Sequence, residues 1–329
     1  LGDVYKRQIW HIENGDITIS AGESGNNVTQ NNNTTYGDTN TIITNQNKDK
    51  ASSHTVTIET NDKNDKVEVT LKDVNIDTSS RNKAAVSVTG SGNTTIKLDG
   101  DNALKSDTYR SGIYGSGSGS LTISGGENDS LTAQGGSGAN GISSSGSLTI
   151  SGGTVTANGD DGGRGISSSG SVTISGGSTV TANGGSGTIS GGDGIWSGGG
   201  VTISGGSTVT ANGGNGGSLV GGDGIRSGGG LTVSDGTVTA KGGNGDSKDG
   251  YGGDGIRSFN PVAISGGTVE AAGGNGSTGG GSGIYSRGDL SISQSAQIKN
   301  ATGGESQSTG GSGIYNPVSY THLRAHETS

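Results

Sequence analysis

The dipeptide Gly-Ile recurs at nearly even spacing over the last two thirds of this 329-residue chain. Successive copies lie 24 to 31 residues apart, a period typical of solenoid proteins. A single repeat cannot bury an apolar face alone, but stacked repeats can. We therefore expect a solenoid in which each Gly-Ile marks one coil. The repeated isoleucines are Ile113, Ile142, Ile166, Ile195, Ile225, Ile256, Ile284 and Ile314.

Each repeat contains three short segments, joined by two nearly constant spacings and one variable spacing. The first segment is Gly-Ile, the second is an L/V-T-I triplet such as Leu148–Ile150, and the third resembles Thr154–Ala157. The connection from the third segment to the next Gly-Ile varies from 11 to 18 residues and is rich in Gly, Asn, Asp and Ser. This pattern predicts three strands per coil, with two tight corners and one loop of free length.

Apolar and polar residues alternate within these segments. Leu148 and Ile150 point to one side and Thr149 to the other, as expected for a strand with one buried face. The β-branched residues and the many glycines disfavour a helix. The sequence therefore predicts an all-β fold, a single-stranded parallel β-helix with three short strands in each of about 10–12 coils.

Glycine placement decides between order and disorder. The chain has 72 glycines and only 25% hydrophobic residues, a composition that alone suggests disorder. However, 64 glycines fall within residues 111–316, where corners require positive φ or close backbone approach. We expect regular glycine-rich coils over residues 111–317. Residues 9–110 are predicted to form less regular coils of the same helix, separated by Asn-rich stretches such as Asn26–Thr35.

Composition also excludes several classes of function. The absence of cysteine removes disulfides, thiolate metal sites and thiol nucleophiles. No apolar run approaches the ~18–20 residues of a membrane span. The net charge of −9 argues against a nucleic-acid partner, which requires clustered Lys and Arg.

Both ends of the chain are related through one DNA element. A single DNA string encodes Leu1–Gln8, and its reverse complement in a shifted frame encodes Val318–Arg324. This string resembles the transposon-end adapter used for sequencing libraries. We expect residues 1–8 and 318–329 to be translated adapter, and the natural protein to continue beyond both ends.

The residue after each Gly-Ile should face outward, because the isoleucine faces inward. Four of the nine aromatic residues outside the adapter segments fall at this position, together with two arginines. Aromatic faces stack on sugar rings, and Arg forks pair with carboxylates. We therefore predict a groove for a linear, acidic glycan along this column. The alternative is a solvent-exposed face that tolerates large residues. The candidate residues are Tyr114, Trp196, Arg226, Arg257, Tyr285 and Tyr315.

Three aspartates occupy the same place in a repeated G-G-D-G-I motif. Asp193, Asp223 and Asp254 should stack in adjacent coils, where like charges repel unless a cation offsets them. Calcium is one candidate, because it prefers several oxygen ligands. Pairing with the nearby Arg226 and Arg257 is another, and aspartates that accept corner N–H groups are a third.

Two other functions, ice binding and glycoside hydrolysis, require recognisable residue patterns. Paired outward threonines recur in the third segment, an array that ice-binding β-helices use, although threonine is also an ordinary strand residue. For a glycosidase, two carboxylates must face one bond, and no such cluster stands out. The histidines His11 and His54 are isolated in the irregular coils. The paired threonines are Thr154/Thr156, Thr179/Thr181, Thr208/Thr210 and Thr237/Thr239.

Five segments of the chain carry a family resemblance: Val69–Asp77, Ala84–Val88, Thr95–Leu104, Gly112–Ile113 and Leu121–Gly125. They resemble bacterial carbohydrate-binding domain proteins, which are right-handed parallel β-helices of the pectate-lyase type. The resemblance spans roughly residues 54–316 and is most specific over 67–125. It implies a right-handed coil, an extracellular or cell-surface location, calcium, and binding of plant or cell-wall polysaccharide without cleavage.

Three functional hypotheses follow. The first is a non-catalytic module that binds polysaccharide, including acidic pectin-like polymers. The second is a purely structural stalk or adhesin shaft. The third is a pectin-active lyase or hydrolase. We favour the two non-catalytic hypotheses and expect no enzymatic activity.

Overall fold

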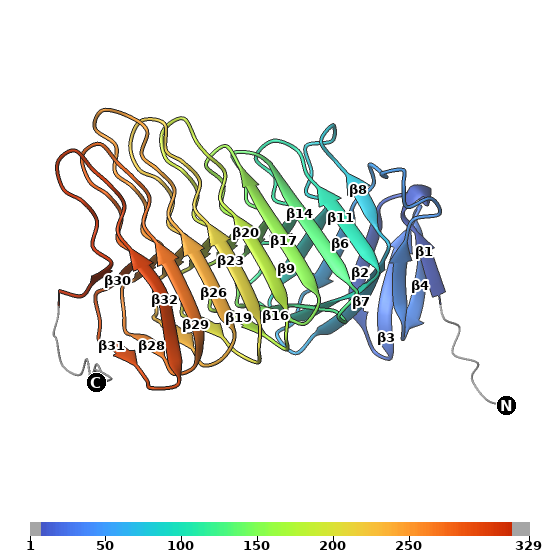
Figure 1. Ribbon diagram of the computed structural model, residues 1–329. Coiled ribbons are helices and arrows are strands. Elements are labelled where there is room, and N and C mark those ends of the chain that lie inside the picture. Colours follow the sequence, from blue (N-terminus) through green and yellow to red (C-terminus); the bar gives the residue numbers. More distant parts are fainter. Residues whose placement is uncertain (1–7, 318–329) are drawn as a thin grey trace.

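The computed structural model describes residues 8–317, which form a parallel β-solenoid of about 11 turns with three sheets (Figure 1). Residues 1–7 and 318–329, and with them most of the predicted adapter segments, lie outside the described residues. Within the described residues the only helix is the 3-10 turn η1 (Ile12–Asn14), so no helix there is long and apolar enough to cross a membrane. The predicted all-β, three-stranded coil is confirmed.

The three sheets correspond to the three repeated segments. Sheet 1 contains the Gly-Ile strands, in the order β4 (Asn33–Asp38), β3 (Gly25–Gln30), β2 (Ile17–Gly22), β6 (Val56–Thr60), β9 (Val86–Gly90), β12 (Ile113–Gly115), β15 (Ile142–Ser144), β18 (Ile166–Ser168), β21 (Ile195–Ser197), β24 (Ile225–Ser227), β27 (Ile256–Ser258), β30 (Ile284–Ser286) and β33 (Ile314–Tyr315). Sheet 2 contains the L/V-T-I strands, in the order β1 (Gln8–His11), β5 (Thr41–Thr44), β7 (Lys66–Lys72), β10 (Asn93–Asp99), β13 (Leu121–Ser124), β16 (Leu148–Ser151), β19 (Val172–Ser175), β22 (Val201–Ile203), β25 (Leu231–Val233), β28 (Val262–Ile264) and β31 (Leu290–Ile292). Sheet 3 contains the T-V-T-A strands, in the order β8 (Asn75–Asp77), β11 (Asp101–Lys105), β14 (Ser130–Ser137), β17 (Thr154–Asp160), β20 (Thr179–Asn183), β23 (Thr208–Asn212), β26 (Thr237–Lys241), β29 (Gly267–Ala272) and β32 (Ala296–Thr302).

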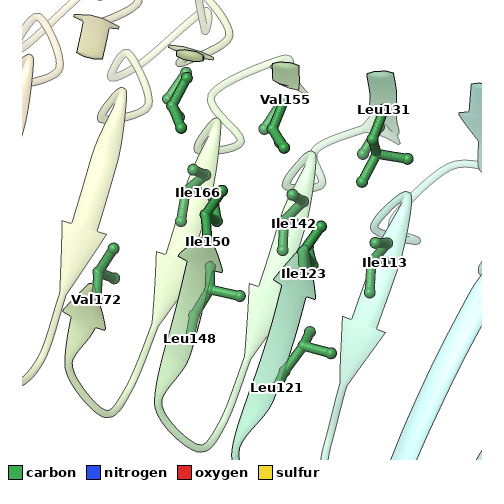
Figure 2. Close-up of a cluster of buried hydrophobic side chains, with 14 of the residues drawn as sticks. Ile113, Leu121, Ile123, Leu131, Ile142, Leu148, Ile150, Val155, Ile166 and Val172 are labelled. Atoms are coloured by element: carbon green, nitrogen blue, oxygen red, sulfur yellow. The ribbon is translucent and has the colours of Figure 1, made fainter. Parts of the chain in front are cut away.

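Equivalent residues of successive coils pair in parallel register. Ile142 is opposite Ile166 in sheet 1, and Leu148 is opposite Val172 in sheet 2. These side chains are fully buried, and Figure 2 shows such Ile, Leu and Val side chains pointing into the coil. The apolar ladders therefore form one continuous core along the axis, and the inward placement predicted from alternation is confirmed.

Glycines allow the variable loops to stack on one another. A Cβ added at Gly192 would lie 2.0 Å from the carbonyl oxygen of Gly163, and one added at Gly222 would lie 1.9 Å from that of Gly192. No real Cβ approaches backbone so closely, so a larger residue would push the loops apart. The glycine content thus permits packing of backbone against backbone, in addition to the positive φ angles found at corner glycines such as Gly176 and Gly205.

The N-terminal end of sheet 1 departs from the predicted pattern. Strands β2, β3 and β4 are antiparallel, whereas the other described strand pairs are parallel. Asn31 and Asn32, with φ angles of 53° and 62°, form the two-residue turn between β3 and β4, and this turn type requires positive φ at both positions. The prediction that the Asn-rich stretch separates strands is therefore wrong, because that stretch forms the hairpin itself.

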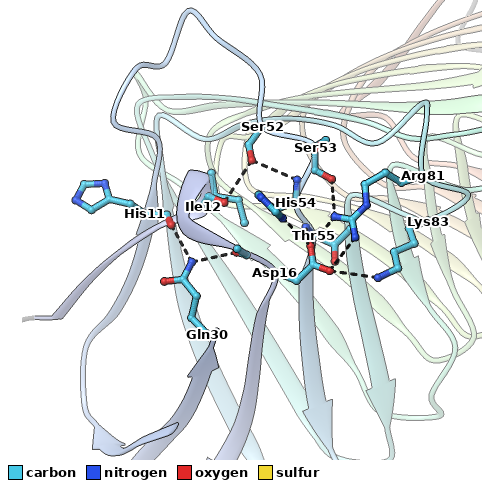
Figure 3. Close-up of polar contacts among 11 residues, drawn as sticks. His11, Ile12, Asp16, Gln30, Ser52, Ser53, His54, Thr55, Arg81 and Lys83 are labelled. Carbon is cyan, nitrogen blue, oxygen red and sulfur yellow. Dashed lines mark hydrogen bonds and ion pairs between the residues drawn. The ribbon is translucent and has the colours of Figure 1, made fainter. Parts of the chain in front are cut away.

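A charged network ties the first coils together (Figure 3). Both carboxylate oxygens of Asp16 accept hydrogen bonds from Arg81, at 2.7 and 3.1 Å, and Lys83 Nζ lies 3.2 Å from Oδ2. His54 Nδ1 lies 3.2 Å from Asp16 Oδ1, so the prediction that His54 is isolated is wrong. Partial burial opposes ionisation of Asp16, but the bonds from Arg81, from the Thr55 backbone N–H and from Lys83 outweigh it and hold the pKa of Asp16 well below its usual range.

Candidate functional site

The column that follows Gly-Ile is in register on sheet 1. Trp196 pairs with Arg226, Arg226 with Arg257, Arg257 with Tyr285, and Tyr285 with Tyr315. These five residues are half-buried or exposed and occupy successive strands from β21 to β33. Tyr114 is also exposed, but Ser143 and Ser167 separate it from the others. We call the continuous set from Trp196 to Tyr315 the axial column.

Ring faces within the axial column are occupied by neighbouring side chains. Tyr285 and Tyr315 stack with ring centroids 5.3 Å apart, and the Arg257 guanidinium carbon lies 5.4 Å from the Tyr285 centroid. Because Arg257 lies on the coil before Tyr285 and Tyr315 on the coil after, both faces of Tyr285 are covered. One face of Trp196 is likewise covered, by Arg164 at 4.5 Å. The ring faces of the column are thus covered in part, which differs from the expected display of free aromatic faces.

Two hollows adjoin the axial column on the side of the variable loops. The larger has a volume of about 590 Å³ and is lined by Arg164, Asp193, Asp223, Arg226 and Arg257, together with loop glycines. The smaller has a volume of about 360 Å³ and is lined by Asp254, Arg257, Tyr285 and Tyr315, also with loop residues. Arg257 lines both hollows, and we call the two hollows together the axial groove.

The three predicted aspartates stack at the corner before Gly-Ile. Asp193 Oδ1 accepts the backbone N–H of Asp223 at 2.9 Å, and Asp223 Oδ1 accepts that of Asp254 at 2.7 Å. Asp254 Oδ1 in turn accepts the Ser282 N–H at 2.6 Å. Two coils before Asp193, Asn140 Oδ1 accepts the Arg164 N–H in the same way. The structure therefore shows these aspartates as acceptors of corner N–H groups, the third of the roles expected for them.

Arginines neutralise part of the charge of these aspartates, but not the pair that we expected. Arg257 Nε lies 2.6 Å from Asp254 Oδ2 and 3.5 Å from Asp223 Oδ2. Asp193 Oδ2 is instead 3.2 Å from Arg164 Nε. Sequence reasoning missed Arg164, although it precedes Gly-Ile at the position that the aspartates occupy in later coils. The prediction that Arg226 helps to offset them is wrong, because no carboxylate pairs with Arg226 in residues 8–317.

Asp223 is the most perturbed carboxyl group of this site. Burial raises the pKa of Asp223 to about 7, Arg257 opposes the rise, and the charges of Asp193 and Asp254 add to it. Asp223 is only 4% exposed and shares its single arginine with Asp254. The site therefore holds a carboxyl group whose charge depends on pH near neutrality.

A metal site is not apparent from the side chains that the structure describes. No group of three or more His, Asp or Glu side chains among them is arranged to hold a metal ion. The Oδ1 atoms of the aspartate ladder are used by backbone N–H groups, and the Oδ2 atoms face arginines. The donor set therefore does not fit calcium, which prefers several free oxygen ligands.

The predicted threonine array also lies in register, on sheet 3. Thr154, Thr179, Thr208 and Thr237 pair in succession and are exposed. Their partners two residues on are half-buried. Since sheet 3 is distinct from sheet 1, the array and the axial column occupy different faces of the solenoid.

Fold and site together define a parallel β-solenoid with a charged axial groove. Comparison with protein-family models, with curated proteins and with solved structures gives no match for this chain. The fold confirms the β-helix part of the resemblance to carbohydrate-binding proteins.

Proposed function

We propose that the chain is a non-catalytic, extracellular bacterial module that binds a linear plant or cell-wall polysaccharide along the axial groove. The observation that carries this proposal is that two hollows follow each other along the axis and share Arg257. Stacked strands are separated by ~4.8 Å, close to the length of a sugar ring, so a linear polymer can meet equivalent side chains at regular intervals. The resemblance to carbohydrate-binding β-helices points the same way.

The mode of binding follows from how the side chains are oriented. Guanidinium groups, tyrosine hydroxyls and the indole N–H suit hydrogen bonds to hydroxyl and carboxyl groups of a sugar chain. Stacking of sugar rings on tyrosine faces contributes less, because Tyr285 is enclosed by Arg257 and Tyr315. The proposal assigns no metal to the aspartates, so chelation of divalent ions should leave the affinity unchanged.

A structural stalk is the second candidate function. It is favoured by the mutual contacts of the column, where Tyr285 packs against both neighbours and Trp196 against Arg164. In that case the large residues stabilise the solenoid, and ligand binding belongs to another part of the protein.

A glycan array probed with the full chain separates these functions. We expect binding to a subset of linear plant or cell-wall polysaccharides, and at least a tenfold loss for Arg257→Gln, an estimate based on a charge-assisted hydrogen bond of about 1.5–3 kcal/mol. Tyr36→Ala is the matched control, because Tyr36 is 76% exposed on β4, outside the groove. Absence of binding, or equal binding by Arg257→Gln, would favour the stalk. Release of unsaturated or reducing sugars would favour an enzyme.

A further inference from the structure

The larger hollow contains three arginines whose charges are not equally compensated. Arg164 pairs with Asp193, and Arg257 pairs with Asp254 and Asp223. Arg226 lines the same hollow, yet within residues 8–317 it has no ion pair. Its guanidinium carbon instead lies 5.4 Å from the ring centroid of Phe259. The positive charge of Arg226 is therefore available to a ligand.

The Nε atom of Arg226 carries a second signal. It is buried, and no hydrogen-bond partner for it exists in the described part of the chain. A buried donor without a partner costs roughly 1–3 kcal/mol. Rotation of the guanidinium group toward the hollow would give Nε and one Nη a shared acceptor, at the loss of the contact with Phe259. Such two-point contacts are how arginine holds a carboxylate.

We propose that Arg226 is an anion-binding subsite, which takes a carboxylate group of the ligand into the larger hollow. The inference rests on the proposed polysaccharide function and gives it a substrate class, an acidic polymer such as one built from uronic acids. Neighbouring charges set the selectivity. Arg257 adds a second guanidinium to the hollow, while Asp193 and Asp223 are buried and already bonded to backbone N–H groups.

The subsite can be tested without a polymer. The Arg226 Nε–H resonance, observed by ¹H–¹⁵N NMR on the full chain, should shift saturably with galacturonate and remain still with galactose. Arg287 is the matched reference, because it contacts the same Phe259 ring at 5.0 Å but does not line the larger hollow. An Arg226 signal that ignores galacturonate, or that moves only as much as the Arg287 signal, would overturn the proposal.

A polymer experiment separates this inference from the proposed function. Polygalacturonate and its carboxyl-reduced form are compared for binding to the wild type, Arg226→Gln and Arg287→Gln. We expect Arg226→Gln to lose about tenfold in affinity for the acidic polymer alone, Arg226→Lys to lose less, and Arg287→Gln to lose nothing. Thermal melts check that each variant is folded.

The remaining outcomes are distinguishable. Equal wild-type affinity for the two polymers would overturn the anion subsite and leave polysaccharide binding intact. Binding of neither polymer, together with a galacturonate shift at Arg226, would support the subsite and exclude polygalacturonate as the polymer, while absence of binding on the whole glycan array would overturn the polysaccharide function.

Discussion

Asp223 carries a buried charge that its neighbours compensate only in part. Its backbone role requires an acceptor at Oδ1, but nothing in that role requires a negative charge, since Asn140 performs it in an earlier coil. The carboxylate therefore costs folding free energy above its raised pKa. The pKa of Asp223 is higher in the folded state than in the unfolded state, so the protonated carboxyl group contributes favourably to the free energy of unfolding. This contribution is complete below about pH 4 and is lost as the pH rises through about 7.

Asp223→Asn should consequently stabilise the protein at pH 8 and change its stability little at pH 4. The asparagine keeps the acceptor for the Asp254 N–H and removes the charge. Denaturant unfolding at the two pH values measures the effect. Asp254→Asn serves as the comparison and should destabilise at pH 8, because Asp254 has a close arginine partner. A destabilised Asp223→Asn at pH 8 would contradict the raised pKa.

A substitution at the single residue Gly192 tests the close packing of the loops. Gly192→Ala should cost roughly 1–3 kcal/mol, because its Cβ would lie 2.0 Å from the Gly163 carbonyl oxygen. Gly200→Ala is the matched control, since the nearest atom to its Cβ is 3.5 Å away, and it should be neutral or stabilising by about 0.4–1 kcal/mol. Equal midpoints of denaturant unfolding for the two variants would refute the packing argument.

At the scale of elements, side-chain networks connect segments that the backbone ladders alone leave apart. Asp16 lies just before β2, whereas Arg81 and Lys83 lie between β8 and β9. The ion pairs therefore tie the N-terminal strands to a later coil. Since the folded-state pKa of Asp16 is lowered, this contribution is present above the ordinary Asp pKa of about 3.9 and is lost as the pH falls below it.

Asp16→Asn should lower the thermal midpoint at pH 7, and the difference from wild type should shrink as the pH falls below about 4. Asp49→Asn is the control, since Asp49 lies in an exposed turn and has no ion pair among the described residues. A midpoint difference for Asp16→Asn that stays constant from pH 7 to pH 3 would show that lost packing, rather than lost charge, is responsible.

The elements also show what the sequence could and could not predict. The rows of Ile, Leu and Val were predictable, because fixed spacings within the repeat force equivalent residues into register. The β3–β4 hairpin was not, because its stretch has little apolar alternation and the signal is the Asn31–Asn32 turn. The contacts of Arg164 and Arg226 were also missed. Their directions depend on loops of variable length and on rings such as Phe259, which the repeat does not specify.

At the scale of the whole molecule, the solenoid converts a repeated sequence into a regular surface. About 11 turns give a continuous core, so different outward residues can vary without loss of the fold. The threonine array and the axial groove lie on different faces of the solenoid. The face that a bound ligand protects from hydrogen exchange therefore identifies its binding site.

The central claim is that a polysaccharide lies along the axial groove. Hydrogen–deuterium exchange of the full chain, with and without a bound polymer, tests it most directly. We predict slower exchange in the loop segments that line the groove, with no change over the threonine strands of sheet 3. These segments are residues 138–140, 162–164, 190–193, 220–223, 252–254, 280–282 and 309–312. Protection of sheet 3 in place of these loops, or no protection with a saturating polymer, would contradict the account.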